Sequence, residues 1–441
     1  MVDPLTIQTA FPLGDEFLRA PEDIAARRRR RLLTGGALLT LFFVSQEVQL
    51  FKFLEGLQIV KLTAVAVAVL LLSSRDQLID RVRLRDAPQA KMIIGLLAVA
   101  VLTIPFAVWP NVSFQYAADA YVKNVIFVYL LLQTVRSDKD ARVIATVLSA
   151  GSAVLVIPML THFGPWVTYK ADPTRVAVGG TYDANDLALL FVVTIPFAFF
   201  ALKGSSRMVK LILLSSMLLM LIGMVKTESR GGFVGLVVIG VMLFLTGSGQ
   251  ARKYTLIAVI AGTALFSVAA PSAYWDRIDT IFHYQKDYNL KEAGGRIMIW
   301  KTGLKMIEQN PIIGVGIGCF PNEHAKLSPY HLQSAAHNAF VQVTAELGIV
   351  GLFLFISIIV VSLVMSQRIK RAARAHLTDP DLLWLASAVQ VSFIGYVTCA
   401  FFLSHAYSGI FSFCVATGAI MTARYRAWRR SAAPAEEIEY A

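Results

Sequence analysis

Long apolar stretches recur along most of the chain, and they constrain its fold more than any other feature. Each approaches the length of about 20 residues that a helix needs to cross a hydrocarbon core of ~30 Å. The 441 residues are 56% hydrophobic and only 16% charged, which is more apolar surface than a soluble core would use. Twelve spans are predicted, at about 32–45, 57–73, 92–109, 120–135, 144–160, 185–202, 211–225, 233–248, 254–270, 338–366, 382–403 and 409–423.

The placement of lysine and arginine sets the expected orientation, because cytoplasmic loops retain positive charge. Most of the 41 basic residues fall in alternate loops, which we assign to the cytoplasmic side together with both termini. No small-residue cleavage site follows the first apolar stretch, so we expect the basic N-terminal tail to be retained. The expected divisions are a cytoplasmic basic tail at 1–31, transmembrane helices one to nine at 32–270, a long outer loop at 271–337, helices ten to twelve at 338–423, and a cytoplasmic tail at 424–441.

The retention of lysine and arginine in the predicted cytoplasmic loops also explains the formal charge of +12. A nucleic-acid partner would require the basic residues on one accessible face, whereas here they follow the predicted topology. Cys319, Cys399 and Cys414 are too few and too scattered for a disulfide framework or a cysteine zinc site, and we interpret them as apolar core residues. The composition therefore predicts an all-α integral membrane protein.

Basic residues are sparse on the predicted outer side, and two arginines among them lie in glycine-containing motifs. In RVAVGGTYDANDLALL (175–190), Arg175 and a Gly-Gly pair lead into a helix that begins near Asn185. Helix capping alone would explain the asparagine, so a cap and a substrate contact both stay open for Asn185. In KTESRGGFVGL (226–236), a very short turn keeps Arg230 near the helix ends. Arg230 could snorkel to the interface, but the two glycines after it would also let a ligand approach.

The outer loop at 271–337 contains GGRIMIWKTGLKMIEQNPIIGVGIGCF. Between Ile297 and Glu308 the apolar residues fall on one half of a helix, and Lys301, Lys305 and Glu308 fall on the other half. This pattern predicts an amphipathic helix on the outer membrane surface or over the ends of the spans, with Arg296 at its first turn. Pro311 ends the helix, and the glycines that follow predict a tight irregular turn.

Polar residues open the next apolar stretch, HNAFVQVTAELG. In a helix that starts at Asn338, the side chains of Asn338, Gln342 and Glu346 share one stripe. Glu346 is costly in hydrocarbon and must face protein or water, where we expect it to order this stripe. His337 lies at the junction of loop and helix, within reach of an aqueous substrate, and its ordinary pKa suits a general base. A lone histidine is more often structural, but the outward arginines favour a catalytic one.

Two other interpretations compete with this one. His324, His331 and His337 with Glu323 could form an outer-loop zinc site, although their spacing matches no compact ligand pattern. A transporter for a lipid-linked glycan could use polar groups within the spans. Such transporters usually contain internal repeats, and none is evident between the two halves of this sequence.

Four segments, taken in order, resemble one family. RVAVGGTYDANDLA, ESRGGFVGL, GGRIMIWKTGLKMIEQNPIIGVGIGCF and HNAFVQVTAELGIVGLFLF resemble motifs of the O-antigen ligase and polymerase superfamily of bacterial membrane glycosyltransferases. The chain looks most like the ligases that join O-antigen to lipopolysaccharide core. Repeat-unit polymerases and protein O-oligosaccharyltransferases look alike at these positions. The resemblance implies a GT-C-like fold in the bacterial inner membrane, with a periplasmic active site.

The resemblance also implies a reaction. A glycan would pass from undecaprenyl pyrophosphate to a sugar hydroxyl of lipid A-core, with inversion and without a metal or other cofactor. The family's outer-loop histidine and arginines correspond here to His337, Arg230 and Arg296, with Arg175 as a further candidate. Asn185 and Asn338 are candidate substrate contacts. The expected partners are this donor, this acceptor and membrane lipids.

Overall fold

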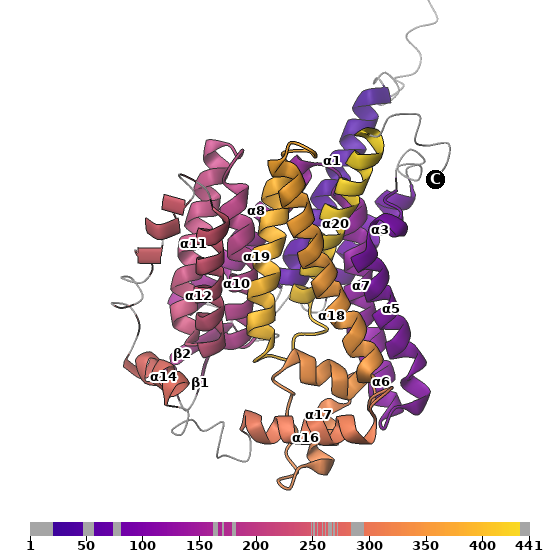
Figure 1. Cartoon of the computed structure of the whole chain (residues 1–441), viewed down its shortest axis with the longest axis vertical. Helices are drawn as coiled ribbons and strands as arrows, with labels where there is room; N and C mark the ends of the chain where they lie inside the picture. Colours follow the sequence, from indigo (N-terminus) through magenta and orange to yellow (C-terminus); the bar gives the residue numbers. More distant parts are fainter. Residues whose placement is uncertain are drawn as a thin grey trace, which may run out of the picture.

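The chain forms a bundle of helices in a computed structural model (Figure 1). The structure describes residues 21–46, 57–73, 81–161, 166–169, 172–178, 182–247, 272–283 and 295–432, with short pieces between 249 and 270. The first half contains α1 (Pro21–Thr40), η2 (Leu41–Ser45), α3 (Ile59–Leu72), η4 (Leu84–Asp86), α5 (Pro88–Leu102), η5 (Ile104–Phe106), α6 (Pro110–Tyr116), η6 (Ala117–Tyr121), α7 (Val122–Thr134), α8 (Asp138–Val154), α9 (Val156–Thr161), β1 (Trp166–Tyr169), β2 (Asp172–Val178) and α10 (Ala184–Ala201). The second half contains α11 (Arg207–Thr227), α12 (Arg230–Thr246), α14 (Ser272–Phe282), α16 (Arg296–Gln309), α17 (Phe320–Leu327), α18 (Ala339–Arg374), α19 (Leu382–Ala400) and α20 (Gly409–Ala432).

Five helices of the described part are long and apolar enough to cross a membrane, judged by length and composition. They are Asp138–Thr161, Ala184–Ala201, Arg207–Thr227, Ala339–Arg374 and Leu382–Ala400. Three shorter apolar helices, α3, α5 and α12, accompany them. The predicted helical membrane class is thus confirmed, while the number of twelve spans stays a prediction. The antiparallel hairpin of β1 and β2 is a departure from the purely helical expectation.

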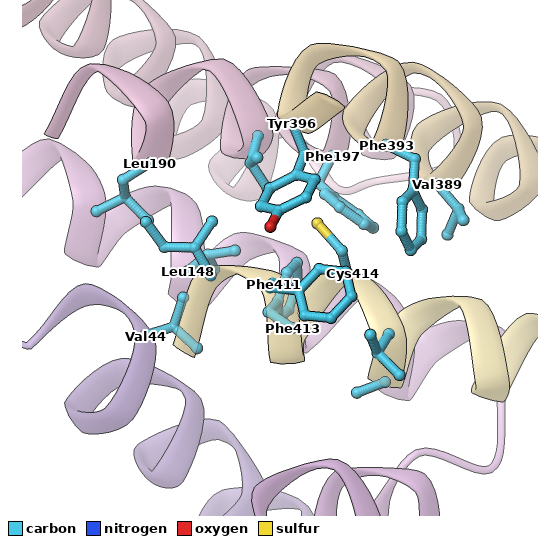
Figure 2. Close-up of a cluster of buried hydrophobic side chains, with 14 of the residues drawn as sticks. Val44, Leu148, Leu190, Phe197, Val389, Phe393, Tyr396, Phe411, Phe413 and Cys414 are labelled. Atoms are coloured by element: carbon cyan, nitrogen blue, oxygen red, sulfur yellow. The ribbon is translucent and has the colours of Figure 1, made fainter. Parts of the chain in front are cut away.

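The core lies where α10, α19 and α20 pack together. α10 is apolar on all sides and is buried along most of its length, as expected for a central helix. Figure 2 shows the aromatic cluster between these helices, in which the Tyr396 and Phe411 ring centroids lie 5.2 Å apart. The Phe197 and Phe413 ring centroids lie 5.0 Å apart in an edge-to-face arrangement. These ring contacts pack α20 against α10 and α19 in the core of the bundle.

The two ends of the bundle differ in chemistry. The start of α1 and the end of α20 lie together at the upper end in Figure 1, whereas α14, α16 and α17 lie at the lower end. At the upper end Arg430 binds Asp86 through two nitrogens, at 2.8 and 2.9 Å, and Arg29 pairs with Asp140. The chain segments predicted to be cytoplasmic and those predicted to form the outer loop are therefore on opposite ends.

Several helices extend beyond their predicted apolar stretches. α18 continues to Arg374 and α20 to Ala432, because their basic ends keep helical backbone after the apolar residues stop. The helix predicted from amphipathic patterning is confirmed as α16, which ends two residues before Pro311. Residues 1–20 and 433–441 of the predicted tails, and parts of the span predicted at 254–270, lie outside the described residues.

α18 is broken at Gly348, where the backbone has φ 64° and ψ −165°. The break frees the backbone groups around it, and the chain from Pro311 to Gly316 binds them. Val315 N–H donates to the Ala345 carbonyl at 2.8 Å, and Gly316 N–H donates to the Glu346 carbonyl at 2.9 Å. Ile349 N–H donates to the Pro311 carbonyl at 2.9 Å. Backbone groups away from water need such partners, so this junction fixes the segment from Pro311 to Gly316 to α18.

Alanine at Gly348 should weaken this junction. The backbone conformation there is almost restricted to glycine, and a Cβ would overlap the Ile312 carbonyl. We expect Gly348→Ala to lower the free energy of unfolding by about 2 kcal/mol or more. The measurement is thermal unfolding in detergent. Gly95→Ala is the control, because a Cβ there meets only Leu354 of α18 at 3.7 Å. Equal melting temperatures for the two variants would contradict the expectation.

Candidate active site

Four helices, α10, α12, α16 and α18, begin at the lower end of the bundle, close to the loop between α19 and α20 (Figure 1). We refer to residues 401–408 as the α19–α20 loop. Phe402 of this loop lies between two of the helix starts. Its ring centroid is 5.9 Å from Cζ of Arg296, the first residue of α16. Its side chain would lie 3.5 Å from a Cβ on Gly231, the second residue of α12. The starts of α12 and α16 therefore meet at the α19–α20 loop.

His337, which lies just before α18, contacts the same α19–α20 loop. Its backbone N–H donates to Ser404 Oγ at 2.7 Å, and its φ of 47° is left-handed. This conformation is uncommon for a residue with a side chain, so the hydrogen bond helps to hold it. The next residue, Asn338, caps α18, because its Oδ1 accepts from Phe340 N–H at 2.9 Å and Val341 N–H at 3.1 Å. The Asn338 carbonyl oxygen is thus committed to the helix.

Arg296 and His337 lie within each other's electrostatic reach. Burial lowers the pKa of His337 below its usual value, and the positive charge of Arg296 lowers the pKa further. The carboxylates of Asp183 and Asp186 offset part of this shift. His337 is therefore neutral near pH 7, which leaves one ring nitrogen free of a proton. An imidazole in this state can accept a proton.

Arg230 begins α12, as its motif suggested, but its guanidinium faces α14. Nη1 donates to Thr280 Oγ1 at 2.5 Å. Two further contacts hold α14 against this turn: Tyr274 OH donates to the Ser229 carbonyl at 3.2 Å, and Arg277 lies 3.8 Å from the buried Glu228. Arg230 therefore lies where α12 meets α14.

Asn185 connects two of the helix starts. Its Oδ1 accepts from Ser229 Oγ at 2.9 Å, which ties α10 to α12. The cap of α10 is Asp183, whose Oδ1 accepts from Asn185 N–H at 2.7 Å and Asp186 N–H at 2.9 Å. Arg175 lies on β2, and its side chain falls outside the described residues.

Residues 215–356 contain Arg230, Arg296 and His337, and this segment matches one known family. It is the O-antigen ligase family. The chain is also 24% identical over 293 residues to the exopolysaccharide production protein ExoQ of Rhizobium meliloti, which covers 61% of this chain and 63% of that protein. It is 25% identical over 202 residues to an uncharacterized protein of Haemophilus influenzae, which covers 42% of this chain and 50% of that protein.

These alignments span less than two thirds of the length of either relative. The predicted resemblance to the O-antigen ligase and polymerase superfamily is nevertheless confirmed. Residues 215–356 are therefore similar to the O-antigen ligase family.

One pair of residues at this site lies outside the O-antigen ligase segment and was not singled out from the sequence. His405 Nε2 lies 2.7 Å from Asp186 Oδ1, across 219 residues of sequence. Burial alone would lower the pKa of His405, but the Asp186 charge and hydrogen bond outweigh it and raise the pKa above its usual value. The available sequence signal was Asp186 in the first turn of a capped helix. No local pattern marks its partner.

Glu346, within the O-antigen ligase segment, has a different role from the predicted one. Its side chain is buried, and Oε1 accepts from Phe320 N–H at 3.1 Å at the start of α17. The carboxylate therefore holds the turn that follows the Val315 and Gly316 junction. The sequence predicts that Glu346 orders the stripe with Asn338 and Gln342. The carboxylate instead reaches across to backbone far along the chain.

The residues of the alternative zinc site have other partners. His324 Nδ1 lies 2.7 Å from the Leu332 carbonyl oxygen, and His331 Nδ1 lies 3.1 Å from the Ala325 carbonyl oxygen. Glu323 accepts from Trp109 and Lys326, each at 3.2 Å. Within the described residues, no three histidine, cysteine or acidic side chains cluster closely enough to share a metal ion.

Proposed function

We propose that this protein transfers a glycan from undecaprenyl pyrophosphate to a sugar hydroxyl of lipid A-core. The observation that carries the proposal is the meeting of Arg296 and His337 at the α19–α20 loop, within a segment that matches the O-antigen ligase family. The guanidinium of Arg296 suits an anionic donor, and the imidazole of His337 suits a hydroxyl acceptor.

The start of α16 is suited to the donor diphosphate. A helix start carries partial positive charge and free N–H groups, which favour an anion. Gly295, the N-cap of α16, provides no side chain for those groups, whereas Asp183, Ser229 and Asn338 cap α10, α12 and α18. Arg296 adds a planar guanidinium that binds phosphate oxygens in pairs and stays charged. Arg230 and Arg175 complete the proposed set of phosphate ligands.

His337 is the proposed general base. As the acceptor oxygen attacks the anomeric carbon, its proton passes to the neutral imidazole and a new C–O bond forms. The bond from that carbon to the diphosphate oxygen breaks on the opposite face, so the anomeric configuration inverts. Undecaprenyl pyrophosphate leaves with the electron pair, and the arginines stabilise its charge. We expect this reaction to need no metal ion, because diphosphate is already a good leaving group.

The proposed location is the bacterial inner membrane, with both termini in the cytoplasm and the active site facing the periplasm. The support is the separation of the basic helix ends of α1 and α20 from the outer loop, which lie on opposite ends of the bundle (Figure 1). Positive residues on the cytoplasmic side follow the general rule for membrane proteins.

A second candidate acceptor is a growing polysaccharide. The exopolysaccharide production protein of Rhizobium meliloti favours it, since that name describes polymer synthesis rather than attachment to lipid. Both candidates use the same donor, the same base and the same bond changes. They differ only in which hydroxyl enters the site.

An acceptor competition tests the proposal. Purified full-length protein in detergent receives an undecaprenyl-pyrophosphate-linked glycan with lipid A-core, free polysaccharide and a serine-rich peptide together, in excess chelator. We expect a covalent glycan product on lipid A-core. A product on polysaccharide would select the polymerase, and a product on peptide would select a protein glycosyltransferase. No covalent product with any acceptor, with or without added metal, would support a transporter instead.

Replacing the proposed base should remove most activity. We expect His337→Ala to slow transfer about 10²- to 10⁴-fold at pH 7.5 while the protein still folds. Wild-type transfer should fall as the pH drops through the lowered pKa of His337, below the ordinary 6.5. The matched control is His331→Ala, because His331 is exposed in the same outer loop and should retain the wild-type rate. A wild-type rate for His337→Ala would remove this residue from the mechanism.

Lysine should not replace Arg296. It keeps the charge but cannot present two parallel N–H donors to a phosphate. We expect Arg296→Lys to reduce kcat/KM for the donor by at least about tenfold, a loss of roughly 1.4 kcal/mol of transition-state stabilisation. Lys305→Ala, on the exposed side of α16, serves as the control. Unchanged kcat/KM in Arg296→Lys would leave Arg296 only a packing contact of Phe402.

A further inference from the structure

We propose that Asp186 and His405 form a positioning pair, which holds the α19–α20 loop so that His337 stays in its reactive conformation. This inference rests on the proposed function, in which His337 is the base. It adds two residues that lie outside the matched O-antigen ligase segment, and no sequence pattern marks them as a pair, although Asp186 lies in the stretch RVAVGGTYDANDLALL.

The geometry provides a continuous path from α10 to His337. His405 is 9% exposed, and its Nε2 lies 2.7 Å from Asp186 Oδ1 at the first turn of α10. The preceding residue, Ser404, accepts the His337 N–H at 2.7 Å. The pair and this hydrogen bond are therefore neighbours on one short loop. A movement of the loop away from α10 would pull Ser404 away from the strained backbone of His337.

The backbone around His405 limits how the loop can move. The His405 carbonyl accepts from Tyr396 OH of α19 and from Ser408 Oγ, each at 3.0 Å. These bonds fix the backbone of the loop near α19 and α20. The contact between the His405 side chain and Asp186 attaches the loop to α10. Nδ1 of His405 is buried and has no hydrogen-bond partner among the described residues, so no second side chain competes for the ring.

The charges that act on His405 come from α10. Asp186 and Asp183 favour its protonated form, while the hydroxyls of Tyr396 and Ser408 reach only its carbonyl. Because the pKa of His405 is raised on folding, the ion pair is fully present below the ordinary pKa of 6.5. It is lost as the pH rises through the raised value. Above that pH the neutral imidazole can still donate one N–H to the Asp186 carboxylate, but the bond is weaker because the imidazole no longer carries a positive charge.

The pKa of His337 is lowered and the pKa of His405 is raised, so the transfer rate should have a maximum at a pH between these two pKa values. Transfer rises on the acid side as His337 loses its proton, since the pKa of His337 is lowered. Transfer falls on the alkaline side as His405 loses its proton, since the pKa of His405 is raised. The rate on the alkaline side should not reach zero, because the neutral imidazole still donates to the Asp186 carboxylate and attaches the loop. It should level off at a lower rate.

The test is the pH dependence of kcat from about pH 5.5 to 9.5 in purified full-length protein. His405→Gln can still donate an N–H to Asp186 but cannot be protonated. We expect its kcat to be about tenfold below the wild-type maximum, with unchanged donor KM and no alkaline limb. Asp186→Asn keeps the size and removes the charge, so its alkaline limb should move to lower pH. The control is His283→Gln, because His283 pairs with Asp279 at 2.9 Å in an exposed setting and should keep the wild-type profile.

The outcomes separate this inference from the proposed function. If His405→Gln keeps the wild-type alkaline limb while His337→Ala is inactive, the positioning pair is wrong and the proposed function stands. If His337→Ala keeps the wild-type rate, the proposed function fails first. Should His405→Gln not fold, Asp186→Asn decides: an unmoved alkaline limb in that variant overturns the inference.

Discussion

The organisation of the end of the bundle that carries α16 and α17 depends on how the break in α18 satisfies its backbone. An apolar setting provides no water for freed carbonyl and amide groups, so another segment must bind them. The chain from Pro311 to Gly316 does so, and Gly348 makes the close approach possible. The same junction fixes the end of α16 and the turn before α17. This junction sets where the segment between α16 and α17 lies. The Glu346 carboxylate adds a further hydrogen bond to Phe320 N–H at the start of α17.

The first two turns of α16 connect the two residues proposed for the reaction. Trp300 Nε1 donates to the Ala336 carbonyl at 3.0 Å, next to His337. Arg296, one turn earlier, lies over Phe402 of the α19–α20 loop. α16 thus carries Arg296, the proposed phosphate ligand, and through Trp300 it also contacts the backbone next to His337, the proposed base. Ile299, Trp300 and Met306 of this helix pack in a cluster with Phe320 and Ala345, whereas Lys301 and Lys305 are exposed. The helix is a structural part of the site rather than a cover laid over it.

Local patterns in the sequence predicted the local structure well. The amphipathic period predicted α16, and the ordered motifs predicted that Arg296 and His337 belong to one site. The glycines after Pro311 predicted a tight irregular turn, and the structure shows left-handed backbone at Gly314, Gly316 and Gly318. Long-range contacts were not predictable. Glu346 bonds to Phe320 and Arg230 bonds to Thr280, and neither partner follows from spacing along one helix. The Asp186–His405 contact joins residues 219 apart, so only the packing of α10 against the α19–α20 loop could reveal it.

The charges around His337 must meet two opposing demands. A base near a diphosphate site lies close to arginine, which keeps it unprotonated but also makes it a weaker proton acceptor. Asp183 and Asp186 act in the opposite direction on the same imidazole and limit the fall in its pKa. Both carboxylates are held by the first turn of α10, where they also cap the helix. Removing either charge would therefore weaken His337 as a base even though neither carboxylate is proposed to touch the substrate.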